Sequence, residues 1–198
     1  MISAVILAAG KSRRMGRPKM LLPWGDTVVL GHVISVFAAA GLEDILVVTG
    51  AVREKIEGIV SEYGKDFPVR TVYNEDYQEG EMLSSLKCGL RDLAGSGARA
   101  ALIGLGDQPQ VQEKTVRLVC ESFRLTGSPL VIPSFQMRRG HPWLASRRFW
   151  MDLLELHPSQ TPRDFLDAHR RDIQYVEVDA PSILADLDTP EDYRASRS

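Results

Sequence analysis

A loop rich in cations follows the first apolar run of the chain. Residues 2–9 read ISAVILAA, and Gly10 breaks this run. The loop then carries Lys11, Arg13, Arg14, Arg17 and Lys19. Apolar runs bounded by glycine are typical of strands buried on both faces. Backbone N–H groups in such a loop, together with lysine and arginine, can neutralise several adjacent phosphate charges. The pattern favours a polyphosphate ligand, with a solvated basic loop or a nucleic-acid patch as alternatives.

Two common phosphate-binding loops do not match this segment. A Walker A loop needs two glycines five positions apart followed by Lys and Ser or Thr, whereas Arg17 and Pro18 follow Gly16 here. The first spacing of the G-x-G-x-x-G dinucleotide fingerprint is also missing. The next helix is expected to begin only at Asp26 or Thr27. Loop amides and side chains are therefore expected to hold the phosphates, more than a helix N-terminus.

Two distant carboxylates could supply a metal site. Asp107 follows the apolar segment 100–105 in the sequence GDQP, and Asp188 lies in ADLDTP near the end of the chain. Mg²⁺ takes oxygen ligands, often only one or two protein carboxylates with phosphate oxygens and water. The alternative for Asp107 is that it bonds its own backbone in a turn, whereas the helix cap expected at Thr189 does not account for Asp188. Combined with the cationic loop, the pair predicts a site for Mg²⁺ beside a polyphosphate.

Apolar, β-rich segments alternate with helical patterns along the chain. This alternation predicts right-handed βαβ crossovers and a mostly parallel sheet covered on both faces, with ligands at the carboxyl ends of the strands. The segment Phe135 to Leu144 interrupts the rhythm and predicts a loop or hairpin over one edge. Thr161 and Thr189, each followed by Pro, predict helix starts. The expected strands are Ala4–Ala8, Ile45–Thr49, Val69–Tyr73, Ala100–Gly104, Leu130–Pro133 and Ile173–Val178, and the expected helices are Val28–Ala40, Arg53–Tyr63, Leu83–Leu93 and Glu113–Leu125.

Composition narrows the class of protein. With 198 residues, 44% of them hydrophobic and 25% charged, one α/β domain over residues 1–198 is expected. The formal net charge of −2 argues against a dedicated nucleic-acid binder. No apolar run is long enough to span a membrane, and no signal-peptide pattern opens the chain. Cys88 and Cys120 show no metal-binding spacing, so a cytoplasmic location is expected.

Five segments of the chain resemble one family, and they occur in its order. They are LAAGKSRRMGRPKMLLPW, GEMLSSL, GDQP, RRGHP and DLDTPEDY. The chain is similar to the MobA-like nucleotidyltransferases, and within them to the molybdenum cofactor cytidylyltransferase group. The resemblance implies a three-layer Rossmann-like fold with a mostly parallel central sheet, of the nucleotide-diphospho-sugar transferase type. It also implies Mg²⁺-dependent transfer of CMP from CTP to the terminal phosphate of molybdopterin, with release of pyrophosphate.

The resemblance also implies roles for individual residues. Arg14, Lys19 and Asp107 would be catalytic, and Asp107 and Asp188 would bind Mg²⁺. Members that carry LAAG resemble this chain and are cytidine-selective, whereas relatives that use guanosine typically carry LAGG. The expected nucleotide-binding residues are Leu7, Ala8, Ala9, Gly10, Ser12, Arg14, Lys19, Asn74, Gly80, Ser84 and Ser85, and those expected to meet the acceptor are Arg139, Gly140 and His141.

Three alternatives stay open from the sequence. The nucleotide could be GTP. The acceptor could be another small phosphate, such as a sugar phosphate. The chain could also be a non-catalytic accessory protein that carries the cofactor, although retention of Lys19, Asp107 and Asp188 speaks against lost chemistry. A molybdoenzyme or its chaperone is a further expected partner; nucleic acid and membrane are not.

Overall fold

An eight-stranded sheet forms the centre of the computed structural model, which describes residues 1–79 and 81–196. The strand order is β5-β4-β1-β6-β9-β7-β10, with β8 beside β7. β9 runs antiparallel to both its neighbours and β8 runs antiparallel to β7, while the remaining pairs are parallel. The strands are β1 (Ile2–Leu7), β4 (Ile45–Thr49), β5 (Val69–Tyr73), β6 (Ala100–Leu105), β7 (Leu130–Phe135), β8 (Arg138–Arg139), β9 (Trp143–Ser146) and β10 (Ile173–Glu177).

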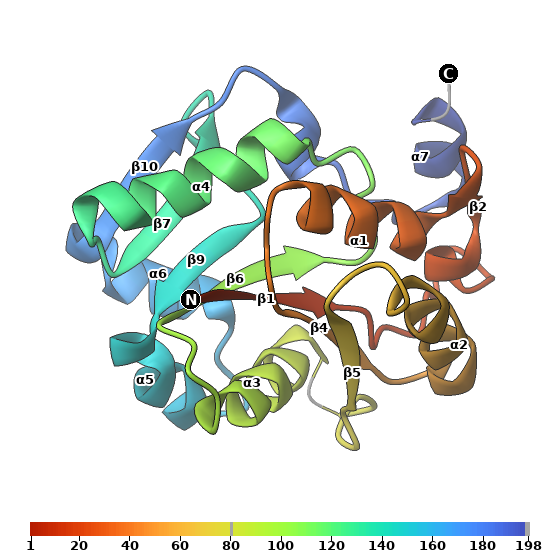
Figure 1. Ribbon diagram of the computed structural model, residues 1–198, viewed down its shortest axis with the longest axis horizontal. Helices are drawn as coiled ribbons and strands as arrows, with labels where there is room; N and C mark the ends of the chain where they lie inside the picture. The colour runs from red at the N-terminus through yellow and green to blue at the C-terminus, as the bar shows by residue number, and fades with distance from the viewer. Residues whose placement is uncertain (80, 197–198) are drawn as a thin grey trace.

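Helices cover both faces of this sheet, with α1 and α4 on one side of the central strands and α3 and α5 on the other (Figure 1). The side chains of β1 alternate between the two layers: Ala4 and Ile6 join the core under α1 and α4, and Val5 and Leu7 join the core under α3. The expected three-layer α/β fold is therefore confirmed. The helices are α1 (Val29–Ala39), α2 (Arg53–Tyr63), α3 (Glu81–Ala94), α4 (Glu113–Thr126), α5 (Trp150–Glu155), α6 (Pro162–Ala168) and α7 (Pro190–Ala195).

The expected strands and helices all form, but the segment 135–144 differs from its prediction. Its first part is a hairpin of β7 and β8, turning at Gln136 and Met137, which both have positive φ. The chain then enters β9, which lies between β6 and β7 inside the sheet and not over an edge. Leu144 is fully buried there. The position is favourable because both neighbouring strands satisfy its backbone groups.

The two Thr-Pro segments begin helices as predicted. Thr161 starts α6 and Thr189 starts α7, each through a capping box with the aspartate three residues later. The predicted start of α1 at Asp26 or Thr27 is wrong. Residues 27–28 form the strand β3 (Thr27–Val28), which pairs with β2 (Pro23–Trp24), and the Thr27 hydroxyl lies 2.6 Å from that of Tyr63.

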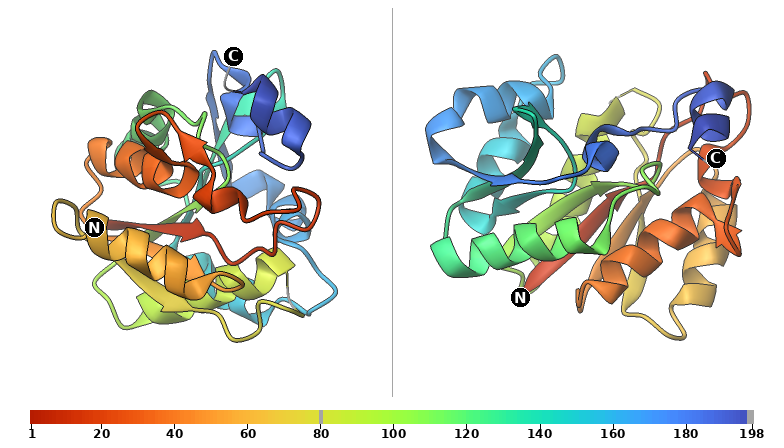
Figure 2. Two further views of the ribbon diagram at one scale, coloured as in Figure 1. Left: turned by 90° about the vertical axis from the view of Figure 1, so that its right-hand side faces the viewer. Right: turned by 90° about the horizontal axis from the view of Figure 1, so that it is seen from above.

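The C-terminal segment returns to the loop that follows β1. α7 lies beside β2 in Figure 1, and the views in Figure 2 show the same neighbourhood from two further sides. Tyr193 of α7 is buried with Met15, Leu22 and Leu187, so this small cluster attaches the first and last parts of the chain to each other. Among residues 1–79 and 81–196, no helix combines the length and the hydrophobicity that crossing a bilayer would need.

Candidate functional site

The loop after β1 is folded around Ser12. Its φ of 50° places it in the left-handed region, and its side-chain oxygen accepts a hydrogen bond from the Lys19 backbone at 3.1 Å. Met15 is buried, which fixes the middle of the loop against the C-terminal segment. Within the described part of the chain, the N–H groups of Gly10 and Lys11 donate no hydrogen bond. The loop therefore offers backbone donors beside its cations, as phosphate-binding loops do.

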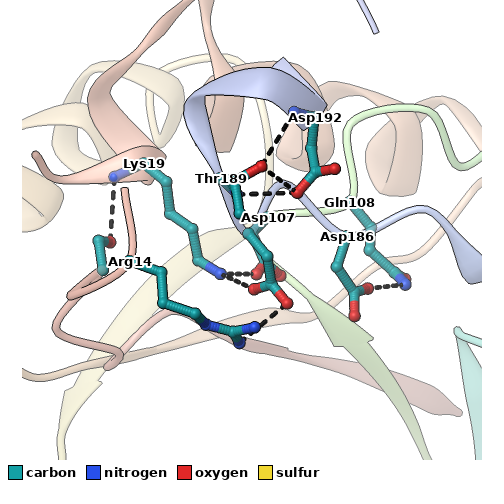
Figure 3. Close-up of polar contacts among 9 residues, drawn as sticks. Arg14, Lys19, Asp107, Gln108, Asp186, Thr189 and Asp192 are labelled. Carbon is teal, nitrogen blue, oxygen red and sulfur yellow. Dashed lines mark hydrogen bonds and ion pairs between the residues drawn. The ribbon is translucent and has the colours of Figure 1, made fainter. Parts of the chain in front are cut away.

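Lys19 lies between two carboxylates that come from opposite parts of the chain. Its Nζ forms an ion pair with Asp107 Oδ2 and lies 3.3 Å from Asp188 Oδ1. The Arg14 guanidinium lies 2.9 Å from Asp188 Oδ2. Figure 3 shows the Lys19 side chain reaching Asp107, with the Arg14 guanidinium beside it. The structure thus brings together the two cations and two carboxylates that the sequence singled out as a site.

Burial and charge act on Lys19 in opposite directions. Burial works to lower the pKa of the Lys19 ammonium, but the carboxylates of Asp107 and Asp188 outweigh burial and raise that pKa above its ordinary value. Only 14% of the Lys19 side chain and 11% of that of Asp107 are exposed, whereas 72% of the Arg14 side chain is exposed. Lys19 is therefore a fixed charge at neutral pH, and the exposed Arg14 reaches Asp188 from the surface.

The donors fit a divalent cation that is bound together with a nucleotide. Carboxylate oxygens are the ligands that Mg²⁺ prefers, and two suffice when phosphate oxygens and water complete the shell. Among the described residues, no group of three or more His, Cys, Asp or Glu side chains is arranged to hold a metal ion. The positive charge of Lys19 already occupies the space between Asp107 and Asp188. This geometry suits an ion that arrives with its own oxygen ligands.

A cavity of about 450 Å³ is lined by Arg14, Lys19, Asp107 and Asp188. It lies between the loop after β1 and the start of α3, where Tyr77, Gln78 and Met82 form the opposite wall. Among the described residues, the predicted Ala8, Asn74 and Ser84 are not part of its lining, and Gly80 lies outside the described residues. The predicted residues that line the cavity are Leu7, Ala9, Gly10, Ser12, Arg14, Lys19, Ser85, Asp107 and Asp188.

Asn74 is engaged within the protein. Only 2% of it is exposed, and its Nδ2 donates to the hydroxyls of Ser84 at 2.9 Å and Ser85 at 3.1 Å. Its Oδ1 accepts from the Asp76 backbone at 3.1 Å. The side chain therefore joins the end of β5 to the first turns of α3. An asparagine at a strand exit gives the same sequence pattern whether it binds a ligand or its own loop.

A second cavity, of about 1400 Å³, adjoins the first, and Met82 lines both. Arg139, Gly140 and His141 line it as a group, together with Arg138, Arg163 and Arg170. Met82, Met137 and Tyr175, which also line it, are among the large hydrophobic side chains that are exposed. Positive charge next to exposed apolar and aromatic surface suits a ligand that is both anionic and largely apolar or planar.

Residues of the RGHP segment form hydrogen bonds with other parts of the protein, which the sequence did not predict. Arg139 donates to Asp167 at 2.7 Å and to the Tyr175 hydroxyl at 2.9 Å. The His141 backbone donates to the Ile183 carbonyl at 3.1 Å. Burial lowers the pKa of His141 to about 4, so its imidazole is neutral at pH 7 and offers no positive charge to an anion.

The sequence did not predict a hydrogen bond between Gln108 and Asp186 beside the site. The buried Gln108 donates from Nε2 to Asp186 Oδ1 at 2.6 Å, as Figure 3 shows. Asp186 lines the smaller cavity. Burial, and then the nearby carboxylates of Asp107 and Asp188, raise the pKa of Asp186. Asp186 lies in the same ADLDTP segment as Asp188, but no local pattern connects it to Gln108.

Comparisons with known proteins agree with this geometry. The chain is 27% identical to the molybdenum cofactor cytidylyltransferase of Escherichia coli K12 over 97% of this chain and 93% of the relative. Its fold is similar to the crystal structure of Rv0371c from Mycobacterium tuberculosis H37Rv, with a TM-score of 0.84, 29% identity and coverage of 98% of this chain and 96% of that chain. A structure of Rv0371c in complex with manganese matches with a TM-score of 0.79 and 28% identity, covering 99% of this chain and 97% of that one. Residues 4–173 match the model of the MobA-like NTP transferase domain, and the chain therefore belongs to this family.

Proposed function

We propose that this chain transfers CMP from CTP to the terminal phosphate of a molybdopterin, releasing pyrophosphate in a reaction that needs a divalent cation. The observation that carries the proposal is the cluster of Arg14, Lys19, Asp107 and Asp188 at the floor of one cavity, with an arginine-lined cavity adjoining it. One cavity would hold the nucleotide and the other the acceptor. Because the two cavities adjoin at Met82, the α-phosphate of the nucleotide and the terminal phosphate of the acceptor would meet there.

The cations of the loop would hold the triphosphate. The N–H groups of Gly10 and Lys11 are directed to no acceptor among the described residues, and Arg14 and Lys19 stand beside them. Binding a triphosphate would draw the two cations from their carboxylate partners toward the phosphates. Arg14 and Lys19 would then stabilise the negative charge that develops on pyrophosphate as it leaves.

Asp107 and Asp188 would hold the divalent cation once Lys19 turns to the phosphates. The cation would supply charge neutralisation at the α-phosphate when bound. The manganese complex of Rv0371c supports divalent-cation binding by a protein of this fold. The exposed fraction of the Asp188 side chain, 32%, is consistent with a carboxylate open to a ligand from the cavity.

The acceptor would need little activation by the protein. A phosphate monoester is already an anionic nucleophile near neutral pH, so positioning and charge neutralisation can account for catalysis. Arg138 and Arg163 line the acceptor cavity and form no ion pair or side-chain hydrogen bond within the described residues. They would attract the anionic acceptor, and the exposed Tyr175 would offer an aromatic surface to its ring system.

CTP is the proposed nucleotide because of Ala9. Its methyl group approaches Gly50 so closely that a Cβ atom at position 50 would lie 2.7 Å from Ala9 Cβ. Ala9 lines the proposed nucleotide cavity and Gly50 does not, so this contact fixes residue 9 at the cavity wall. In the segment LAAG this alanine resembles the cytidine-selective members of the family, which favours CTP. The similarity to a protein named molybdenum cofactor cytidylyltransferase supports the same choice.

Purified protein tests the proposal directly. CTP, GTP and ATP would each be incubated with molybdopterin and Mg²⁺, and pyrophosphate and the dinucleotide product would be measured by coupled assay and mass spectrometry. We expect product from CTP, with much less from GTP and ATP. Asp107→Asn is the control that should abolish product while the protein stays folded.

The alternatives give different results in the same assay. Product from GTP alone would refute the choice of CTP. Release with a sugar phosphate but not with molybdopterin would refute the acceptor. Binding of both substrates with no release under any condition would favour a non-catalytic accessory protein.

A further inference from the structure

The segment 183–188, which we term the strap, connects the two cavities. It carries Asp186 and Asp188 at one end and Ile183 at the other. The strap runs past the end of β6, where the Leu187 backbone donates to the Asp107 carbonyl at 3.1 Å. This backbone bond helps to hold Asp188 on the same side of the site as Asp107. The strap otherwise lacks a regular sheet or helix partner over 185–188, so its position depends on a few individual contacts.

Gln108, the buried residue that follows Asp107, makes two of those contacts. Its Nε2 donates to Asp186 Oδ1 at 2.6 Å and lies 3.4 Å from the Ile183 carbonyl oxygen. Both acceptors belong to the strap, and they lie at its two ends. Gln108 is 2% exposed and follows Asp107 directly in the chain. The buried carboxamide of Gln108 therefore fixes the strap next to Asp107, which is the residue that Asp188 must face.

The RGHP segment holds the strap from the acceptor side. The Ile183 carbonyl accepts a hydrogen bond from the His141 backbone at 3.1 Å. A Cβ atom at Gly140 would lie 2.7 Å from Ile183 Cβ and would also collide with the Ile183 carbonyl oxygen. Only glycine lets the two backbones come this close. The glycine of RGHP thus packs on the strap.

We propose that Gln108 is a positioning residue that sets the distance between Asp107 and Asp188 through its hydrogen bonds to the strap. Gly140 packs against the strap from the other side. The inference rests on the proposed function, because it assigns a role within the same carboxylate site. Outer-shell groups of this kind orient the ligands of a metal, and their removal weakens metal binding without removing a ligand. Asp186 then serves as the acceptor of the Gln108 bond.

Gln108→Met and Asp186→Asn test this assignment. Methionine keeps the length of glutamine but cannot donate, so the strap loses its anchor. Asparagine at 186 keeps an oxygen for Gln108 and removes only the negative charge. Mn²⁺ binding would be followed by electron paramagnetic resonance with CTP and without acceptor, using Asp107→Asn as the reference for loss of a ligand. Steady-state kinetics would separate kcat from the KM for CTP.

We expect Gln108→Met to weaken Mn²⁺ binding by about 10-fold or more and to lower kcat, with little change in the KM for CTP. Asp186→Asn should retain affinity close to that of the unmodified chain. Wild-type affinity and turnover in Gln108→Met would overturn the proposal. A loss in Asp186→Asn as deep as that in Asp107→Asn would also overturn it, because Asp186 would then be a ligand. If CMP transfer itself fails, the Mn²⁺ titrations still decide this inference.

Gly140→Ala approaches the strap from the other side. The added methyl should displace Ile183 and weaken Mn²⁺ binding in the same direction as Gln108→Met. Gly95→Ala is the matched control, because a Cβ atom there would meet nothing within 4 Å. Circular dichroism would check that each variant is folded. If Gly140→Ala is not folded, the exchange rate of the Leu187 amide in Gln108→Met provides the second readout: faster exchange supports the proposal, and unchanged exchange contradicts it.

Discussion

Lys19 joins the two halves of the candidate site at the scale of single residues. Its Nζ contacts Asp107 from the end of β6 and Asp188 from the C-terminal segment. Without a triphosphate, these pairs balance charges that would otherwise repel each other. When a triphosphate is bound, the Lys19 ammonium would pair with the phosphates instead, and the two carboxylates would be free to bind the cation. A single lysine would thus couple binding of the nucleotide to binding of the cation.

Lys19→Met removes this charge and keeps much of the side-chain volume. We expect kcat to fall by about 100-fold or more, because a preorganised charge acting on the leaving group is lost. The KM for CTP should change less, since Arg14 and the loop amides remain. Lys114→Met, on the exposed face of α4, is the matched control. Turnover at the wild-type rate in Lys19→Met would rule out this role.

His141 makes a pH-dependent contribution to stability. Burial holds its pKa at about 4 in the folded protein, below the ordinary value of about 6.5 in the unfolded chain. As the pH falls through that interval, the unfolded chain binds a proton that the folded protein does not. The free energy of unfolding should therefore drop between about pH 6.5 and 4, by an amount on the order of 3 kcal/mol, and His141→Gln should lose this part of the slope. Urea denaturation across this range measures both; equal slopes would contradict the prediction.

Ala9 tests nucleotide choice at the level of one methyl group. Ala9→Gly should remove the methyl group that packs against Gly50 beside the proposed nucleotide cavity, and raise the ratio of kcat/KM for GTP to that for CTP by about 10-fold, the usual worth of one methyl group in a binding pocket. Ala8→Gly removes the same group from the core beside the cavity, so it should lower stability and leave the ratio unchanged. An unchanged ratio in Ala9→Gly would remove Ala9 as the source of selectivity.

Local patterns predicted most elements of the fold because their periodicity is strong. The helix Arg53–Tyr63 and the strands Ile45–Thr49 and Val69–Tyr73 form with the expected bounds. β9 was not predicted, because four residues after a Pro carry too little periodicity to indicate a strand. The insertion of β9 between β6 and β7 is a long-range pairing, which no local spacing records.

The contact between α3 and the sheet is tight enough to test at the scale of elements. A Cβ atom at Gly89 of α3 would lie 2.5 Å from Val5 Cγ1 and 3.2 Å from Val48 Cγ2. Gly89→Ala should therefore lower the free energy of unfolding by about 1–3 kcal/mol. Gly58→Ala, in α2, meets nothing within 4 Å and should raise it by roughly 0.5–1 kcal/mol. Urea denaturation compares the two, and a shift of the same sign in both would contradict this account of the packing.

The whole molecule assembles its site from segments that are distant in sequence. Asp107 was predictable because it follows a long buried strand, and Asp188 because a cap did not account for it. Gln108 and Asp186 lie 78 positions apart, and their bond depends on how the chain closes after α6. The partners of Asn74 on α3 likewise become visible only in the folded chain.

Arginines line separate cavities of the molecule. Arg138 and Arg163 line the larger cavity, which we propose binds the acceptor, at the carboxyl ends of the strands, whereas Arg124 lines a separate hollow at their opposite ends. Arg163→Gln should raise the KM for molybdopterin by about 10-fold, the worth of one charge-assisted contact, and leave the KM for CTP unchanged. The effect should shrink as ionic strength rises, because exposed charges are screened. Arg124→Gln changes net charge equally and should leave both KM values in place; equal effects of the two variants would mean that overall charge, and not the acceptor cavity, recruits the acceptor.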